Sequence, residues 1–271
     1  LAAGIPVLGA YMRDTTLKLP ERHLGLVQAR EQDTLKDLLV SLRERTEGSL
    51  DLNALMAAAA PLDIEDHGCV AISPPGQRIA IADDAAFSFL YGHVAQSWRN
   101  AGAELVPFSP LADQGPDEDC DVCWLPGGYP ELHAEQLAAS RHFQSRLVKF
   151  SETRPVHGEC GGFMALGEFL EDANGVTHKM VGLLGHGTSF AKRKMNLGYR
   201  EAILATDCAL GSKGSIFRGH EFHYARVIQS GADEPLATLR DGYGNDLGMA
   251  GGCRGLVSGS FFHVMARRDR K

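Results

Sequence analysis

The sequence has no long apolar run. Its longest candidate, residues 54–62, is about half of the roughly 18 residues that a membrane-spanning helix needs, and it contains Pro61. No charged start followed by an apolar stretch and a small-residue cleavage site marks a secretory signal. We therefore expect a cytoplasmic protein that does not associate with membranes.

Positive charge is also scarce. Asp and Glu (34) outnumber Lys and Arg (27), which gives a formal net charge of −7 over 271 residues. The short basic clusters at 192–194 and 267–268 do not alternate with aromatic residues, as a nucleic-acid-binding surface would require. We expect no nucleic-acid partner.

Cysteines are few and unevenly spaced, and the chain is too large to need disulfide staples, so the six thiols indicate a reducing compartment. Cys120 and Cys123 form a C-x-x-C pair with no second pair to complete a zinc site. The string Gly219–His223 is one residue short of a zincin motif, and the segment 211–215 lacks the residue order of a phosphate-binding P-loop. The sequence therefore predicts neither a metal site nor a P-loop.

The first 75 residues differ in pattern from the rest. Apolar residues 5–10 are typical of a buried strand, and leucines at helical spacing predict an amphipathic helix over 34–45. A second helix is predicted over 51–60, before Pro61. The segment Ser73–Gly76 is typical of a linker, so we place a domain boundary near residue 76. Because Leu1 is not methionine and the chain starts in an apolar run, we expect a C-terminal piece of a longer protein.

From residue 78 onward, strands and helices alternate, which predicts an α/β fold with a parallel sheet. A single long helix is expected from Pro130 to Phe150, and a shorter one over 163–170. After Gly182 the pattern changes to short antiparallel strands. These are predicted at 197–205, 215–228, 236–240, 247–250 and 255–264.

The strongest chemical signal is the run from Pro155 to Phe163, in which a short strand leads through Gly158-Glu-Cys160-Gly-Gly162 into a helix. This is the nucleophile-elbow pattern with sulfur in place of oxygen. A strained nucleophile needs small neighbours, and amides at the start of a helix favour a thiolate. We predict that Cys160 is a nucleophile, although a buried structural cysteine beside a glycine turn is the plain alternative.

A second signal is Pro126-Gly127-Gly128-Tyr129 at the end of the preceding predicted strand. Active sites of open α/β sheets lie at the carboxyl ends of strands. The amides of Gly128 and Gly161 are therefore predicted to form an oxyanion hole. Gly127 and Tyr129 are candidates for substrate binding.

A third signal is His263, which ends the run Gly259-Ser-Phe-Phe near the C-terminus. A cysteine nucleophile needs a base that takes its proton and returns it to the leaving group, so we assign that role to His263. Glu221 and His223 share one face of a predicted strand and are candidates to line the pocket.

In this order, the Pro-Gly-Gly, Gly-x-Cys-Gly-Gly and Phe-His motifs resemble the class I, triad-type glutamine amidotransferases. Longer strings narrow the resemblance to the cobyrinic or hydrogenobyrinic acid a,c-diamide synthase family of cobalamin biosynthesis. These strings are 20–27 (PERHLGLV), 125–133 (LPGGYPELH), 158–164 (GECGGFM), 198–200 (GYR), 219–224 (GHEFHY) and 258–263 (SGSFFH).

The resemblance implies a flavodoxin-like open sheet with a parallel core and antiparallel C-terminal strands. Residues 1–75 would be the tail of an ATP-binding synthetase domain plus a linker, and residues 76–271 the glutaminase domain. Glutamine would be hydrolysed at Cys160 by a carbon–nitrogen ligase that amidates the a and c carboxylates of a corrinoid acid. ATP and Mg²⁺ would act in the synthetase domain, with no cofactor in the glutaminase. A homodimer and the cobalt content of the corrinoid stay open.

The sequence departs from the wider class at one position. Triad amidotransferases carry a glutamate two residues after the histidine, whereas this chain has Met265. The site is therefore expected to work as a Cys160–His263 pair, with any third member elsewhere. Two alternatives stay open: a cysteine hydrolase similar to dienelactone hydrolase, with Asp207 or Asp233 as its acid, and a partner-binding domain without catalysis.

Overall fold

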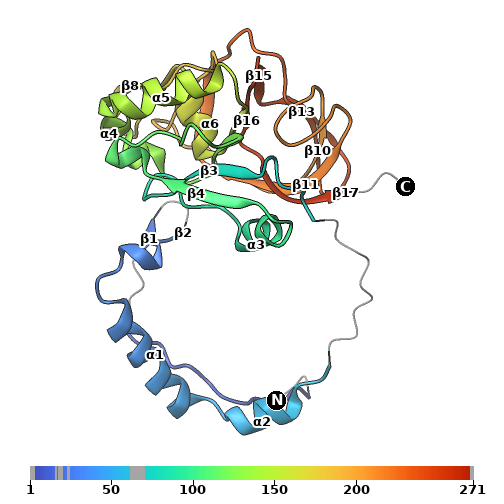
Figure 1. Cartoon of the computed structure of the whole chain (residues 1–271). Coiled ribbons are helices and arrows are strands. Elements are labelled where there is room, and N and C mark those ends of the chain that lie inside the picture. Colours follow the sequence, from blue (N-terminus) through green and yellow to red (C-terminus); the bar gives the residue numbers. More distant parts are fainter. Residues whose placement is uncertain (1–3, 16, 18–20, 23–24, 62–70, 269–271) are drawn as a thin grey trace. The chain divides into compact units, whose positions relative to one another are not determined.

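The computed structural model describes residues 4–15, 17, 21–22, 25–61 and 71–268, in two compact units, Leu1–His67 and Gly68–Lys271 (Figure 1). Pro20, His23 and Leu24 of the first family motif lie outside the described residues, as does Cys69. The assignment of residues 1–75 to a synthetase tail stays a prediction.

The first unit contains the two predicted helices. Helix α1 spans Leu35–Ser49, and α2 spans Leu52–Ala58 after the Asp51 side chain accepts a 2.9 Å hydrogen bond from the Ala54 amide. The predicted buried strand over 5–10 is wrong, because Ile5 is 69% exposed and only Gly9 forms a bridge, to Leu50. The described sheet of this unit, formed by β1 (Glu21–Arg22) and β2 (Gly25–Leu26), is too small to cover such a strand; a 3-10 turn, η1, spans Ala29–Glu31.

The second unit is built on a six-stranded sheet with the order β15-β16-β6-β5-β3-β4. All its neighbours pair in parallel except the edge strand β15, which confirms the predicted parallel core. The strands are β3 (Arg78–Ala82), β4 (Glu104–Phe108), β5 (Val122–Leu125), β6 (Val156–Glu159), β15 (Gly252–Arg254) and β16 (Val257–Ser260).

Helices lie on both sides of this sheet, with α4, α5 and α6 on one side and α3 on the other (Figure 1). Phe143 and Leu147 belong to the apolar layer under the first group, and Trp98 and Trp124 to the layer under α3. The bounds are α3 (Gly92–Asn100), η2 (Pro110–Ala112), η3 (Pro130–Leu132), α4 (Ala134–Ala139), α5 (Arg141–Ser151) and α6 (Gly161–Leu166).

Two helix predictions need correction. The single helix expected from Pro130 to Phe150 is broken into η3, α4 and α5, because Ser140 leaves the helical conformation at ψ 75° and its hydroxyl donates to the Gln136 carbonyl at 2.9 Å. The helix expected over 163–170 lies at 161–166, since Gly167 adopts extended backbone and a strand follows.

Two further sheets are mostly antiparallel, with the orders β14-β13-β10-β11-β17 and β12-β9-β7-β8, the exception being the parallel pair β7 and β9. The first contains β10 (Asn196–Leu204), β11 (Ile216–His223), β13 (Ala237–Asp241), β14 (Asp246–Ala250) and β17 (His263–Arg268). The second contains β7 (Phe169–Glu171), β8 (Thr177–Lys179), β9 (Gly187–Ser189) and β12 (Arg226–Gln229).

The predicted antiparallel strand over 255–264 is wrong in one respect that matters for the site. Its first half, β16, pairs in parallel with β6, so Ser260 lies opposite Glu159. Its second half, β17, pairs antiparallel with β11, so His263 lies opposite His220. The chain therefore changes sheets between Ser260 and His263, next to the end of β6.

Candidate functional site

Cys160 occupies a strained turn between β6 and α6. It is one of two described residues other than glycine with positive φ (φ 46°, ψ −101°), and its amide donates to the Ser260 carbonyl at 2.8 Å. The turn requires a close approach at Gly162, where a Cβ would lie 2.0 Å from the Leu125 carbonyl oxygen. Strain of this kind persists only where the surroundings impose it, and it is concentrated at functional sites.

Gly127 is the point at which the predicted nucleophile and base converge. A Cβ on Gly127 would lie 2.4 Å from Cε1 and 3.2 Å from Nε2 of His263, and 3.4 Å from the Cβ of Cys160. Cys160 and His263, which are 103 positions apart in the sequence, therefore face one small space that only glycine leaves open.

The two predicted oxyanion-hole glycines also lie together. A Cβ on Gly161 would sit 2.9 Å from the Gly128 amide nitrogen and 2.8 Å from Cδ of Pro130. The Gly161 amide also lies within hydrogen-bonding reach of the Cys160 sulfur, where it lowers the thiol pKa. The Gly128 amide thus lies against Gly161, whose own amide lies beside the sulfur, and their joint role as an oxyanion hole stays a prediction.

The resting thiol is not activated as the sequence suggested. Cys160 is only 3% exposed, and burial, followed by the nearby carboxylate of Glu131, raises its pKa well above that of an ordinary thiol. The Gly161 amide opposes this only in part. The Gly161 amide does favour the thiolate, as expected, but burial outweighs it. A proton acceptor must remove the proton during the reaction.

His263 shares the space beside Gly127 with Cys160, whose sulfur donates to the Phe222 carbonyl at 4.0 Å, and His263 is a weak proton acceptor at rest. Burial lowers its pKa to about 3, and repulsion from His220 and His223 acts in the same direction. The His220 ring stacks on the His263 ring, and the Tyr91 hydroxyl forms a hydrogen bond to His220 Nε2. His263 is thus neutral at rest and depends on its surroundings to hold a proton.

Glu159 is a buried residue that the sequence reasoning did not single out. It is 2% exposed, its Oε1 accepts a 2.9 Å hydrogen bond from the Val264 amide, and its Oε2 lies 3.9 Å from Nδ1 of His263. Burial raises its pKa to about 8, and the Val264 hydrogen bond opposes that rise. The sequence did hold a signal: an acidic residue within a predicted buried strand is costly unless it has a partner.

The remaining predicted site residues do not all lie in one place. Glu221 and His223 do lie together, with 3.9 Å between Oε1 and Nε2, and Glu221 accepts a 2.7 Å hydrogen bond from Arg200. Glu221 also lines a cavity of about 390 Å³ that Phe163 and Phe261 bound. The Tyr129 ring is buried against Phe89, with ring centroids 5.1 Å apart.

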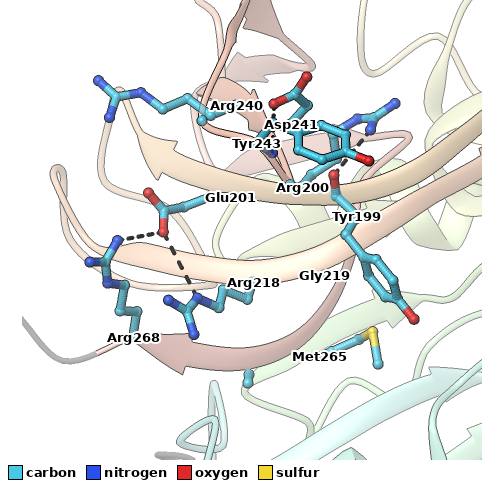
Figure 2. A pocket seen from close by; sticks show the side chains of 13 residues that line it. Tyr199, Arg200, Glu201, Arg218, Gly219, Arg240, Asp241, Tyr243, Met265 and Arg268 are labelled. Carbon is cyan, nitrogen blue, oxygen red and sulfur yellow. Dashed lines mark hydrogen bonds and ion pairs between the residues drawn. The ribbon is translucent and has the colours of Figure 1, made fainter.

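Met265 lies on a different surface from the His263 ring. The pairing of β11 with β17 is irregular at this point. Arg218 pairs with Ala266 and the next residue, Gly219, pairs with Val264, so Met265 lies between two paired residues. Figure 2 shows Met265 in an open hollow of about 670 Å³, in which Glu201 pairs with Arg218 and Arg268. His263 is not among the residues that line this hollow.

The aspartates considered for a hydrolase-type triad have other partners. Asp207 accepts a hydrogen bond from the Lys213 amide, and Asp233 pairs with Arg254 at 2.6 Å. Among residues 4–15, 17, 21–22, 25–61 and 71–268, no group of three His, Cys, Asp or Glu side chains is arranged to hold a metal ion. Over the same ranges, no helix combines the length and the apolar character needed to cross a bilayer.

Curated relatives are close in sequence and longer than this chain. The hydrogenobyrinate a,c-diamide synthase of Mesorhizobium japonicum is 63% identical over 98% of this chain and 61% of its own length. Those of Agrobacterium fabrum and Rhodobacter capsulatus are 59% and 50% identical, over 97% of this chain and 60% of theirs. The chain thus spans about three fifths of the relatives it matches.

A solved glutamine amidotransferase from Thermotoga maritima aligns with 73% of this chain and 76% of its own, at a TM-score of 0.46 and 16% identity. The assignment does not depend on that alignment. Residues 78–271 match the model of the CobB/CobQ-like glutamine amidotransferase domain. The chain belongs to the CobB/CobQ-like glutamine amidotransferases.

Proposed function

We propose that this chain is the glutaminase part of a hydrogenobyrinate a,c-diamide synthase, a carbon–nitrogen ligase of the cytoplasm. The observation that supports this most directly is the convergence of Cys160 and His263 on Gly127, beside the paired amides of Gly128 and Gly161. The relatives' names favour hydrogenobyrinate, the cobalt-free acid, over cobyrinate.

In the proposed reaction, His263 Nε2 takes the thiol proton of Cys160 while the sulfur attacks the side-chain amide carbon of glutamine. The amides of Gly128 and Gly161 hold the oxyanion. His263 returns the proton to the amide nitrogen, the carbon–nitrogen bond breaks, and ammonia leaves a thioester on Cys160. Water then attacks the thioester with His263 as base, and glutamate and the free thiol are released.

The cavity beside Glu221 is the proposed site of the glutamine backbone. It adjoins Phe261 and is bordered by Glu221 and Asp233, whose carboxylates are paired with Arg200 and Arg254 and would be shared with the ammonium group. The ammonia would be used in the part of the relatives that this chain does not span. There ATP with Mg²⁺ would activate the a and c carboxylates for amidation.

The test is glutamate release by the wild-type chain and by Cys160→Ala, with and without MgATP and hydrogenobyrinate. We expect slow, Cys160-dependent release that MgATP does not change, because the sequence lacks a P-loop pattern. Hydrolysis of dienelactone or thioester substrates with none of glutamine would favour the hydrolase alternative. Absence of any hydrolysis, with tight binding of a protein partner, would favour the binding domain.

A further inference from the structure

The predicted base has a buried nitrogen that nothing described here satisfies. His263 is 3% exposed, and its Nδ1 lies in the interior without a hydrogen-bond partner among the described residues. A buried polar atom without a partner costs free energy, so such an atom indicates a contact that forms in another state of the site. The carboxylate of Glu159, 3.9 Å away, is the acidic group paired with this nitrogen.

We infer that Glu159, the residue immediately before the nucleophile, is the positioning residue that orients and charge-stabilises His263. The inference rests on the proposed glutaminase function. Glu159 would be the third member of the catalytic site, a role that Met265 does not fill. It lies on strand β6, whereas Met265 lies on β17.

The geometry leaves one Glu159 oxygen for this role. Oε1 is held by the Val264 amide at 2.9 Å, and Oε2 faces Nδ1 of His263. Because Val264 follows His263 directly, the hydrogen bond from the Val264 amide holds the Glu159 carboxylate beside the segment that carries the base. A shift of about 1 Å would bring Oε2 to hydrogen-bonding distance, and catalytic hydrogen bonds are often longer before substrate binds.

The charges around Glu159 explain what it would do. Facing it are His263 from β17, Cys160 from the next position, and Tyr91, whose pKa burial and the Glu159 charge raise to about 12. His220 lies behind His263 and disfavours protonation of it. When the Cys160 proton moves to Nε2 of His263, the Nδ1–H of the resulting imidazolium donates to Glu159, and the carboxylate balances the new charge. Burial raises the Glu159 pKa to about 8 in the resting site, and the imidazolium, as an opposite charge beside Oε2, favours the ionised carboxylate once it forms.

Glu131 and Glu221 are the other carboxylates near Cys160. Glu131 lies on η3, and Glu221 is held by Arg200 beside His223, whereas the carboxylate 3.9 Å from Nδ1 of His263 is that of Glu159. A purely structural role for Glu159, holding the Val264 amide, would be served equally well by glutamine. That equivalence makes Glu159→Gln the informative substitution, since it keeps the size, the acceptor for Val264 and the burial. It removes the charge and replaces the oxygen that faces His263 with an NH2 group that cannot accept from Nδ1–H.

The experiment compares wild-type, Glu159→Gln and Glu159→Asp chains by glutamate release over a range of glutamine concentrations and pH. For Glu159→Gln we expect kcat to fall by about 10²- to 10⁴-fold, on the scale of losing the acid of a Ser-His-Asp triad, with KM changed by less than about threefold. Glu159→Asp should recover part of kcat. Thermal unfolding of Glu159→Gln should match the wild type, because the neutral side chain costs less to bury.

A Glu159→Gln chain that keeps kcat within about threefold of the wild type would overturn the inference. If the variant does not fold, the ¹⁵N shifts of the wild-type histidines decide, with His263 assigned by its loss in His263→Gln. A proton on Nδ1 supports the inference, and a proton on Nε2 alone overturns it. Wild-type activity that depends on Cys160 is measured first, so a failure of the proposed function is seen separately from a failure of Glu159.

Discussion

The imidazole ring of His220 lies parallel to that of His263, with ring centroids 4.9 Å apart and planes 7° apart. Two stacked imidazoles cannot both carry a proton without strong repulsion, and His220 accordingly lowers the pKa of His263. Burial does most to hold the base neutral and the stack adds to it, and the Tyr91 hydroxyl fixes the outer ring by its contact with Nε2 of His220.

We therefore predict that His220→Phe raises the pKa of His263. Phenylalanine keeps a ring against His263 and removes the second titratable group. An NMR titration of the histidine ring signals should show His263 moving from about 3 toward its ordinary value of about 6.5. An unchanged His263 titration would mean that burial alone sets its pKa.

Cys160 should be the residue labelled by a diazo-ketone analogue of glutamine. The analogue places an electrophilic carbon where the amide carbon is attacked, beside the amides of Gly128 and Gly161. Peptide mass spectrometry should find the label on Cys160 and not on the buried thiols Cys123 and Cys253. Pre-incubation with glutamine should slow labelling. Labelling of another cysteine at the same rate would remove Cys160 from its assigned role.

His263→Ala should lower kcat by at least about 10³-fold while glutamine still binds, because the base acts in proton transfer more than in binding. The matched control is Met265→Ala on the same strand, whose side chain lines the open hollow (Figure 2). Its kcat should stay within about twofold of the wild type. A large loss at Met265 with the fold intact would show that its side chain reaches the base.

Gly127→Ala should reduce activity far more than stability. Its methyl group would lie 2.4 Å from Cε1 of His263, so the ring must move away from Cys160. We expect kcat to fall by at least about 10²-fold, since small displacements of a catalytic group cost this much. Gly242→Ala is the control, because its methyl group meets nothing closer than 3.9 Å and its kcat should not change.

Acid should destabilise the fold through its buried histidines. Burial lowers the pKa of His157 to about 3, and that of His186 to about 4. The unfolded chain therefore binds more protons below about pH 6.5, so the free energy of unfolding falls as pH drops from there toward pH 3–4. Each such histidine should cost about 2 kcal/mol between pH 7 and pH 5. Urea unfolding at the two pH values measures the loss, and His157→Gln should reduce it.

Much of the site could be predicted because it is encoded locally. A tight strand-to-helix turn requires glycine at particular positions. The glycines around Cys160 and in the turn Pro126-Gly127-Gly128 meet this requirement, and they can be recognised in the sequence because they are neighbours along the chain. His263 could be identified because its position follows a strand-like run, although its partners could not.

What could not be predicted depends on contacts between distant segments. The change of sheet between Ser260 and His263, which sets Glu159 beside the base, follows from pairing with β6 and β11. The net pKa shift of Cys160 could not be predicted for the same reason. The start of a helix can be recognised in the sequence. The burial that raises the Cys160 pKa, by more than the helix amide lowers it, arises only when the sheets are assembled.

The hydrogen bond from the Cys160 amide to the Ser260 carbonyl has a consequence for local opening. It joins the nucleophile's turn to the strand that leads into the base, inside the central sheet. Fluctuations that release one partner therefore release the other, and both amides should exchange with solvent deuterium only in rare, large openings. Local fraying therefore cannot separate the turn that carries Cys160 from the strand that leads to His263. Separation of the turn that carries the nucleophile from the strand that leads into the base is tied to unfolding of the sheet as a whole.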